Sequence, residues 1–185
     1  MRLDPNKTWK KVEERLAVEA DPICRRNLEV VLEHMKAEAR LDIDGLIATL
    51  SEEPHYHAYT PAGEIPELCP KGRDGVRQFY QNFVASGAFR LELDIDRLVV
   101  DRDCVLTEGV MRMAYPGTTL ALMGHEVDDP KAYYLFEDRM AVLWPMDEKG
   151  KIKGEDTYSV GRGFEGIAER KIALDEVAPL REAAA

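Results

Sequence analysis

The spacing of hydrophobic residues changes at Gly87, and this change constrains the fold more than any single motif does. Before Gly87, most apolar residues recur every three or four positions, as they do on one face of an amphipathic helix. After Gly87, every second residue is apolar, as in a strand with one buried face. The first residues of this alternating pattern are Phe89, Leu91, Leu93 and Ile95. We therefore expect helices first and an antiparallel sheet second, which is an α+β fold.

The part before Gly87 is expected to contain four helices and one short strand. Asp21 followed by Pro22 is typical of a helix start, because the aspartate caps the first turn and proline fits its first position. Asp42 is expected to cap a shorter helix in the same way, and Gly87 to end the last one. The helices should cover residues 8–20, 22–40, 43–50 and 72–86, and the strand should cover residues 55–60.

Four strands are expected after Gly87, joined in sequence order as an antiparallel meander. Within the first strand the apolar phase shifts at Asp96 and Arg97, which indicates a β-bulge. Bulges let a sheet curl around its helices, so we expect a cone-shaped sheet with one open mouth, where a pocket can form. The strands should cover residues 89–100, 105–115, 132–144 and 151–160.

The charge and the apolar runs of the chain exclude several kinds of partner. A net charge of −10 argues against nucleic acid and against an anionic membrane surface, since both bind clustered lysine and arginine. No apolar run approaches the ~20 residues that span a bilayer, and charges between Arg2 and Lys11 leave no room for a secretory signal. The widely spaced Cys24, Cys69 and Cys104 are typical of free thiols. We expect a cytoplasmic protein.

The closing strand offers the first candidate site. If side chains alternate along residues 151–160, Asp156 and Tyr158 point to the same side as the apolar Ile152. A carboxyl group among apolar neighbours has a raised pKa and suits a general acid or base. Tyr158 can then donate a hydrogen bond to a developing oxyanion. The alternative is that Asp156 pairs with an arginine such as Arg139 or Arg112 and that Tyr158 belongs to the core.

Glu108 is a second candidate carboxylate. It lies within residues 105–115, a strand whose two faces are both largely apolar, so free solvation of Glu108 is not expected. Arg112 shares its face of the strand. Glu108 is therefore either a functional group or the ion-pair partner of Arg112.

The short entry strand adds histidines and tyrosines. His55 and His57 project to the same side, where they can serve acid/base chemistry or, as a His-x-His pair, hold a metal ion. The alternative is a pair of surface or hydrogen-bonded histidines. Tyr56 and Tyr59 can contact a substrate, but one of them must face the other way. His125, in a loop between strands, can reach the cone mouth, although a solvated loop histidine is the plainer interpretation.

Four segments of the chain resemble the SnoaL-like branch of the nuclear transport factor 2-like superfamily, which includes polyketide cyclases and related isomerases and dehydratases. They are residues 41–50, 71–80, 96–109 and 147–158, and the resemblance covers residues 24–160. It implies a single domain, residues 1–185, with acid/base carboxylates, histidines and tyrosines inside a cone. It also implies no cofactor for most members, dimerisation through the outer sheet face for many, and mere ligand or partner binding for others. Residues 1–23 and 161–185 would be peripheral extensions, over a dimer interface or over the pocket mouth.

These residues support one leading hypothesis and two alternatives. The first is a cofactor-independent lyase or isomerase, with dehydratase- or cyclase-type acid/base chemistry on a small apolar carbonyl or hydroxyl compound. In it, Asp156 and His57 share proton transfer. Glu108 assists them, while Tyr158 and His55 hydrogen-bond the oxygen that gains charge. The alternatives are a non-catalytic module for small-molecule binding or dimerisation, and a metal-dependent enzyme that uses His55, His57 and Glu108.

Overall fold

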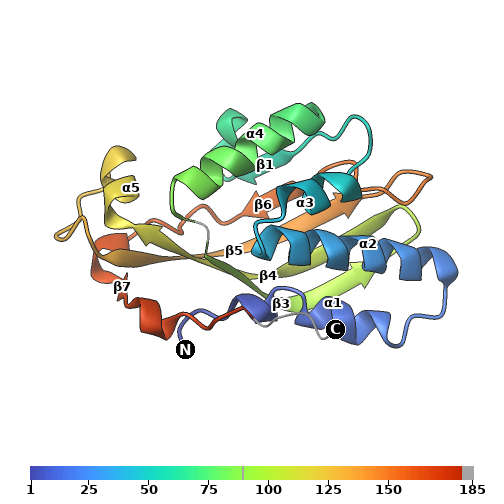
Figure 1. Cartoon of the computed structure of the whole chain (residues 1–185), viewed down its shortest axis with the longest axis horizontal. Helices are drawn as coiled ribbons and strands as arrows, with labels where there is room; N and C mark the ends of the chain where they lie inside the picture. The colour runs from blue at the N-terminus through green and yellow to red at the C-terminus, as the bar shows by residue number, and fades with distance from the viewer. Residues whose placement is uncertain (89, 181–185) are drawn as a thin grey trace.

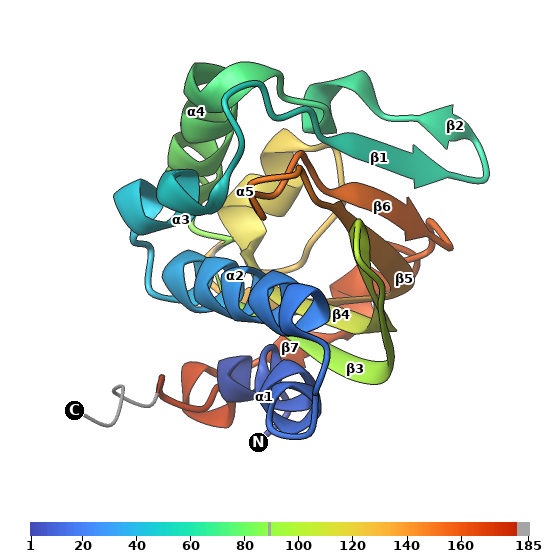
Figure 2. The ribbon, with the colours of Figure 1, turned by 90° about the vertical axis from the view of Figure 1, so that its right-hand side faces the viewer.

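The structure, a computed structural model, confirms the α+β fold and describes residues 1–88 and 90–180. Phe89, placed by its spacing at the start of a strand, and residues 181–185 of the C-terminal extension lie outside the described residues. A strongly curved sheet forms one layer, and helices cover its concave side (Figures 1 and 2). The space between the two layers positions the candidate site.

The sheet is mixed rather than wholly antiparallel. Its strands are β1 His57–Thr60, β2 Gly63–Glu64, β3 Leu91–Val100, β4 Cys104–Pro116, β5 Tyr133–Pro145, β6 Asp156–Ser159 and β7 Lys171–Ile172. They lie in the order β2-β1-β6-β5-β4-β3, and β7 pairs with β5 outside this path. Neighbours along the path are antiparallel except β1 and β6, which run parallel (Figure 2). The short entry strand thus joins the closing strand and extends the wall of the cone.

The helices are α1 Lys10–Leu16, α2 Pro22–Ala39, α3 Ile43–Thr49, α4 Gly72–Ala85 and α5 Gly117–Leu122, of which α2, α3 and α4 lie over the concave side (Figure 2). The expected caps are confirmed. The side chain of Asp21 accepts hydrogen bonds from the backbone of Ile23 and Cys24, and that of Asp42 accepts one from Gly45. None of the described helices combines the length and the apolar character needed to cross a membrane.

The expected bulge is confirmed in β3, where the register against β4 shifts between Ile95 and Arg97. Gly109 pairs with Ile95 at this point, and a Cβ on Gly109 would lie 2.1 Å from the backbone oxygen of Asp94. Glycine is therefore required where these two backbones approach each other. The bulge bends β3 and helps the sheet to wrap around the helices.

The two extensions pack against each other on the convex side of the sheet, away from α4 (Figure 1). Leu3 forms a parallel bridge with Val177 and is fully buried. It packs with Ala114 and Leu135, whose side chains point outward from β4 and β5, and with Ile172. The N-terminal extension therefore covers part of the outer sheet face.

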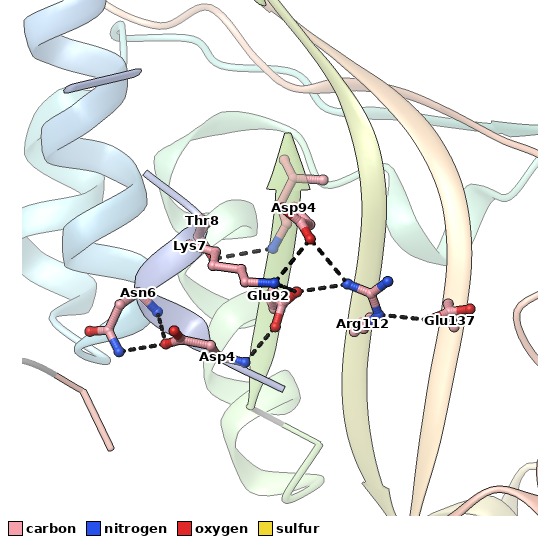
Figure 3. Close-up of polar contacts among 9 residues, drawn as sticks. Asp4, Asn6, Lys7, Thr8, Glu92, Asp94, Arg112 and Glu137 are labelled. Carbon is pink, nitrogen blue, oxygen red and sulfur yellow. Dashed lines mark hydrogen bonds and ion pairs between the residues drawn. The ribbon is translucent and has the colours of Figure 1, made fainter. Parts of the chain in front are cut away.

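A network of charges fastens the N-terminal extension to this face (Figure 3). Glu92 is buried despite its charge and accepts hydrogen bonds from Arg112, at 2.7 Å, and from the backbone N–H of Asp4. Lys7 lies 3.5 Å from the same carboxylate, and Arg112 also donates to Glu137 at 2.6 Å. These donors compensate the cost of burying the Glu92 charge. The outer face of β3 and β4 thus carries charges with a structural role.

Candidate functional site

A cavity of about 360 Å³ lies between the concave face of the sheet and helices α2 and α4. Its wall is mostly apolar and includes Phe79, Phe83, Met111, Met113, Phe136 and Met140. The strands β4 and β5 contribute alternate residues, because side chains of one parity face the concave side. Gly163 and Phe164 of the C-terminal extension also line the cavity, whereas none of the described residues 1–23 does.

Polar side chains gather at the end of the cavity next to α2. We call Glu38, Tyr56, Tyr80, Glu155 and, behind them, His34 the polar floor. Oε1 of Glu155 accepts a hydrogen bond from the Tyr80 hydroxyl at 3.1 Å and lies 3.0 Å from Nε2 of the fully buried His34. Helix α2 supplies two of these residues and α4 one, while Tyr56 and Glu155 directly precede β1 and β6.

The two carboxyl groups of the polar floor have different environments. Burial and the neighbouring Glu155 carboxylate raise the pKa of Glu38 to about 8, although a hydrogen bond with Tyr80 acts in the opposite direction. Glu38 is half-buried, and it lines the cavity. At neutral pH Glu38 is therefore mostly protonated, while Glu155 has the hydrogen-bond donors that suit a carboxylate. Two neighbouring carboxyl groups in different environments are typical of an acid/base pair.

The two phenols of the polar floor stay protonated. Burial and the nearby Glu155 raise the pKa of Tyr56 and of Tyr80 well above the ordinary value. The Tyr56 hydroxyl is buried close to Glu155 and Tyr80, yet it meets hydrogen-bond geometry with none of the described residues. A buried hydroxyl without a partner costs free energy, which marks Tyr56 as a candidate donor to a ligand oxygen.

Asp156 and Tyr158 do not point into the cavity, contrary to the expected facing of the closing strand. The residues of this segment that line the cavity are Glu155, Thr157 and Ser159. Tyr158 is 49% exposed. Burial does raise the pKa of Asp156, as expected for a partly enclosed carboxyl group. The roles expected of Asp156 and Tyr158 in proton transfer nevertheless have no support from the geometry of the cavity.

The expected facing fails because the alternation slips before β6 begins. Ile152 is fully buried on the helix side of the sheet, and Glu155 faces the same side although it is three residues further on. Residues 153–155 run close along the backbone of His55, where a Cβ on Gly154 would lie 1.9 Å from the His55 carbonyl oxygen. This close contact keeps the backbone irregular just before β6. Each later side chain therefore faces the side opposite to the one that regular alternation predicts.

The rings of the entry strand form a stack on its outer side. His55 and His57 share one side, as expected, with ring centroids 4.0 Å apart. The ring of His57 stacks on Tyr59, which stacks in turn on the exposed Tyr158. His57 and Tyr59 line the cavity, and Nδ1 of His57 lies 2.7 Å from Oε1 of Glu64 on β2. Tyr56 faces inward instead, so the two tyrosines do point in opposite directions.

Glu108 lies on the outer face of the sheet and is held by arginines. It pairs with Arg139 on β5, and Arg97 lies 3.8 Å away. The expected partner Arg112 binds other carboxylates (Figure 3). Glu108 is three strands away from β1, roughly 14 Å, so it does not join the two histidines near that strand. Within the part of the chain that the structure describes, no three His, Cys, Asp or Glu residues are arranged to hold a metal ion.

His125 packs at the edge of the cavity rather than in its wall. Its ring stacks on Phe164 with centroids 4.9 Å apart, and Phe164 lines the cavity. His125 follows α5, a short helix that the sequence did not predict. The contact lets His125 shape the cavity through Phe164.

Sequence reasoning missed His34, Glu38 and Glu155. A signal was present for the first two, because they are four residues apart on α2 and lie on the same helix face as the buried Val31. Ionisable residues in an apolar stripe are unusual and mark a candidate site. Glu155 carried no such signal, since its direction depends on the contact between Gly154 and a distant segment.

Comparison with known proteins places this geometry in a family. No curated protein gives a significant match to the sequence. A Shewanella putrefaciens CN-32 protein, provisionally described as a SnoaL-like polyketide cyclase, has a similar structure over 85% of this chain and 92% of that chain, with 10% identity and a TM-score of 0.64. An LEH-like epoxide hydrolase of M. tuberculosis is similar over 78% of this chain and 91% of that chain, with 18% identity and a TM-score of 0.54. A Mycobacterium tuberculosis protein in complex with estradiol-17beta-hemisuccinate is similar over 71% of this chain and 92% of that chain, with 14% identity and a TM-score of 0.53.

At such low identities these structures are evidence of a shared fold, but they are not evidence of a shared activity. The sequence gives the stronger result. A family model for the SnoaL-like domain matches residues 31–153, about two thirds of the chain. The matched segment contains His34, Glu38 and Tyr80 together with the long strands of the cavity wall. The chain therefore belongs to the SnoaL-like domain family.

Proposed function

We propose that this protein is a cofactor-independent lyase or isomerase that acts on a small, mostly apolar carbonyl or hydroxyl compound bound in the cavity. The polar floor is the observation that carries the proposal. It places a protonated Glu38 and a Glu155 bound by His34 at the end of an apolar cavity. Two such groups can give and take protons on one substrate.

In this mechanism the Glu155 carboxylate removes a proton from the carbon next to a substrate carbonyl group. The electron pair of that C–H bond moves toward the carbonyl oxygen, which receives a hydrogen bond from Tyr56. Glu38 then gives its proton either to another carbon, which completes an isomerisation, or to a hydroxyl group that leaves as water. Proton exchange with water restores both carboxyl groups, and the reaction involves no net oxidation.

The lining of the cavity favours an uncharged substrate. Its described residues include three carboxyl groups, Glu38, Asp138 and Glu155, and no lysine or arginine. Asp138 already accepts hydrogen bonds from the backbone of Arg139 and Gly161, at 3.0 and 2.9 Å. An anionic ligand would lose its water without gaining a counter-charge. We therefore expect ketones, enones and β-hydroxy ketones to be better substrates than carboxylates or phosphates.

Glu155→Gln is expected to slow proton abstraction by about 10²- to 10⁴-fold, because the amide keeps the shape of the side chain but cannot accept a proton. The measurement is exchange of the α-protons of apolar ketones in D₂O, followed by NMR. Glu148→Gln, at an exposed position, is the matched control and should keep the wild-type rate. A Glu155→Gln variant that exchanges protons as fast as wild type would remove Glu155 from the role of base.

A non-catalytic binding module is the second candidate function. It is favoured by the mostly apolar lining and by the similarly folded M. tuberculosis protein that was crystallised with an estradiol derivative. In that case the same ketones should bind the wild-type protein tightly, while their α-protons exchange no faster than in buffer. Binding measured by calorimetry alongside the exchange experiment separates the two functions.

We also propose that two copies of the chain associate through the outer face of β4, β5, β6 and β1. This face exposes large hydrophobic residues, among them Tyr158 of β6 and Val160 directly after it, which are 49% and 47% exposed. Tyr158→Glu is expected to halve the molar mass that light scattering reports after gel filtration, from a dimer to 20.9 kDa. Leu122→Glu, at an even more exposed residue of α5, should leave the dimer intact. A wild-type protein of 20.9 kDa would contradict the proposal.

A reducing compartment, the cytoplasm, is the setting that we propose for the protein. Cys24, Cys69 and Cys104 are all free thiols. Burial raises the pKa of each of them, which keeps the thiols protonated and unreactive.

A further inference from the structure

His34 stands behind Glu155 in a chain of hydrogen bonds that ends on the backbone. The Thr49 hydroxyl donates to the backbone oxygen of Leu46 at 2.6 Å. Its oxygen must then accept a hydrogen bond from Nδ1 of His34, which lies 2.7 Å away. Nδ1 of His34 therefore carries a hydrogen, and Nε2 is the ring atom that faces Glu155 at 3.0 Å.

The surroundings of Glu155 decide where the remaining proton of this pair resides. The Tyr80 hydroxyl and Nε2 of His34 converge on the same atom, Oε1. A carboxylate oxygen readily accepts two hydrogen bonds, whereas the hydroxyl oxygen of a protonated carboxyl group is a donor and a weak acceptor. This geometry favours an ionised Glu155 beside a His34 ring that is protonated at both nitrogens.

The resulting charges cancel. His34 is completely buried and the side chain of Glu155 is 13% exposed, so an unbalanced charge on either residue would be costly. The other ionisable groups that face the pair are Glu38 from α2, Tyr80 from α4 and Tyr56 before β1, all of them protonated at neutral pH. The polar floor as a whole is then uncharged, as its apolar surroundings require.

We propose that His34 is a positioning residue that keeps Glu155 ionised and directed into the cavity, by carrying the single proton that the two residues share. The catalytic importance of His34 rests on the proposed function, in which Glu155 is the base. Without the positive ring of His34, Glu155 would lack a counter-charge in this apolar place and would take up a proton itself. It could then no longer accept one from a substrate.

Ring ¹⁵N NMR of the substrate-free protein at pH 7 tests the assignment of charge. Both ring nitrogens of His34 are expected to carry hydrogens in wild type. In Glu155→Gln, the ring should become neutral and keep its hydrogen on Nδ1, where Thr49 holds it. His125→Gln is the control and should leave the His34 signals unchanged. A neutral His34 in wild type, or a doubly protonated one in Glu155→Gln, would overturn the proposal.

A pair of substitutions at Thr49 tests positioning. Thr49→Val removes the acceptor that orients the His34 ring, whereas Thr49→Ser keeps it. Proton abstraction from a ketone is expected to slow by about 10- to 100-fold in Thr49→Val and to stay within about twofold of wild type in Thr49→Ser. Equal rates in the two variants, with both folded by circular dichroism, would overturn the positioning role. The NMR experiment needs no substrate, so the two proposals can fail separately. A wild-type protein without turnover would contradict the proposed function, while the NMR spectra would still decide whether His34 carries the shared proton.

Discussion

Replacing Gly154 by alanine is expected to destabilise the protein by about 3 kcal/mol, at the upper end of the usual cost of overpacking. The new Cβ would lie 1.9 Å from the carbonyl oxygen of His55 and 2.8 Å from its carbonyl carbon. Because both atoms belong to the backbone, no side-chain rotation relieves the clash. The segments must separate and weaken backbone hydrogen bonds, such as that from the His57 N–H to the carbonyl oxygen of Glu155 at 2.9 Å. Urea unfolding measures the loss.

Gly75→Ala provides the matched control for this prediction. Gly75 lies in α4, and the atoms nearest to a Cβ there are 3.9 Å away. Alanine is a better helix former than glycine, so this variant should be neutral or stabilised by about 0.5–1 kcal/mol. Equal stability of Gly154→Ala and Gly75→Ala would show that the segment before β6 yields easily, and that Gly154 does not fix the direction of Glu155.

The second large effect concerns pH. In wild type, the free energy of unfolding is expected to fall as the pH rises from about 5 to about 9, and Glu38→Gln should remove most of this fall. Glu38 ionises near 4.5 in the unfolded chain, whereas its pKa in the folded protein is about 8. Between these values the folded state holds a proton that the unfolded state releases, so the stabilisation that Glu38 contributes to the folded state is complete below pH 4.5 and is lost as the pH rises past 8.

The size of this effect follows from the shift of the pKa. At about 1.4 kcal/mol per unit, the shift of Glu38 corresponds to a change on the order of 4 kcal/mol across the range. Denaturant unfolding of wild type and Glu38→Gln at pH 5, 7 and 9 measures it. Glu33→Gln, on the exposed side of the same helix, should keep the wild-type slope. A slope that persists in Glu38→Gln must come from another group.

Long periodic segments were predicted well from the sequence. The bulge at Arg97 was visible as a phase shift, because the strand around it is long enough for a change of parity to stand out. Short segments were predicted less well. Helix α1 ends at Leu16 rather than at residue 20, and α5 occupies a segment expected to be a loop. Short helices depend on tertiary packing more than on propensity, and the fully buried Leu120 supplies that packing for α5.

The facing of the site residues shows the same limit. The expected facing of Asp156 assumes that one unbroken strand runs from Ile152 through Gly154. In the structure β6 begins at Asp156, and the residues before it follow β1 and the segment leading into it. Regular alternation therefore predicts that Asp156 faces the cavity, whereas Glu155 does so in the structure. The error is one residue in register, which is enough to exchange the two faces of a strand.

The sequence by itself determined the order of the elements, the capping of α2 and α3, and the bulged, curved sheet, because caps and periodicity act through residues close together in the chain. The tertiary structure decided the parallel pairing of β1 with β6 and the acids that face the cavity. Those features depend on contacts between segments about a hundred residues apart, such as Gly154 against His55 and His34 against Glu155. A local pattern of residues cannot predict contacts between segments so far apart in the chain.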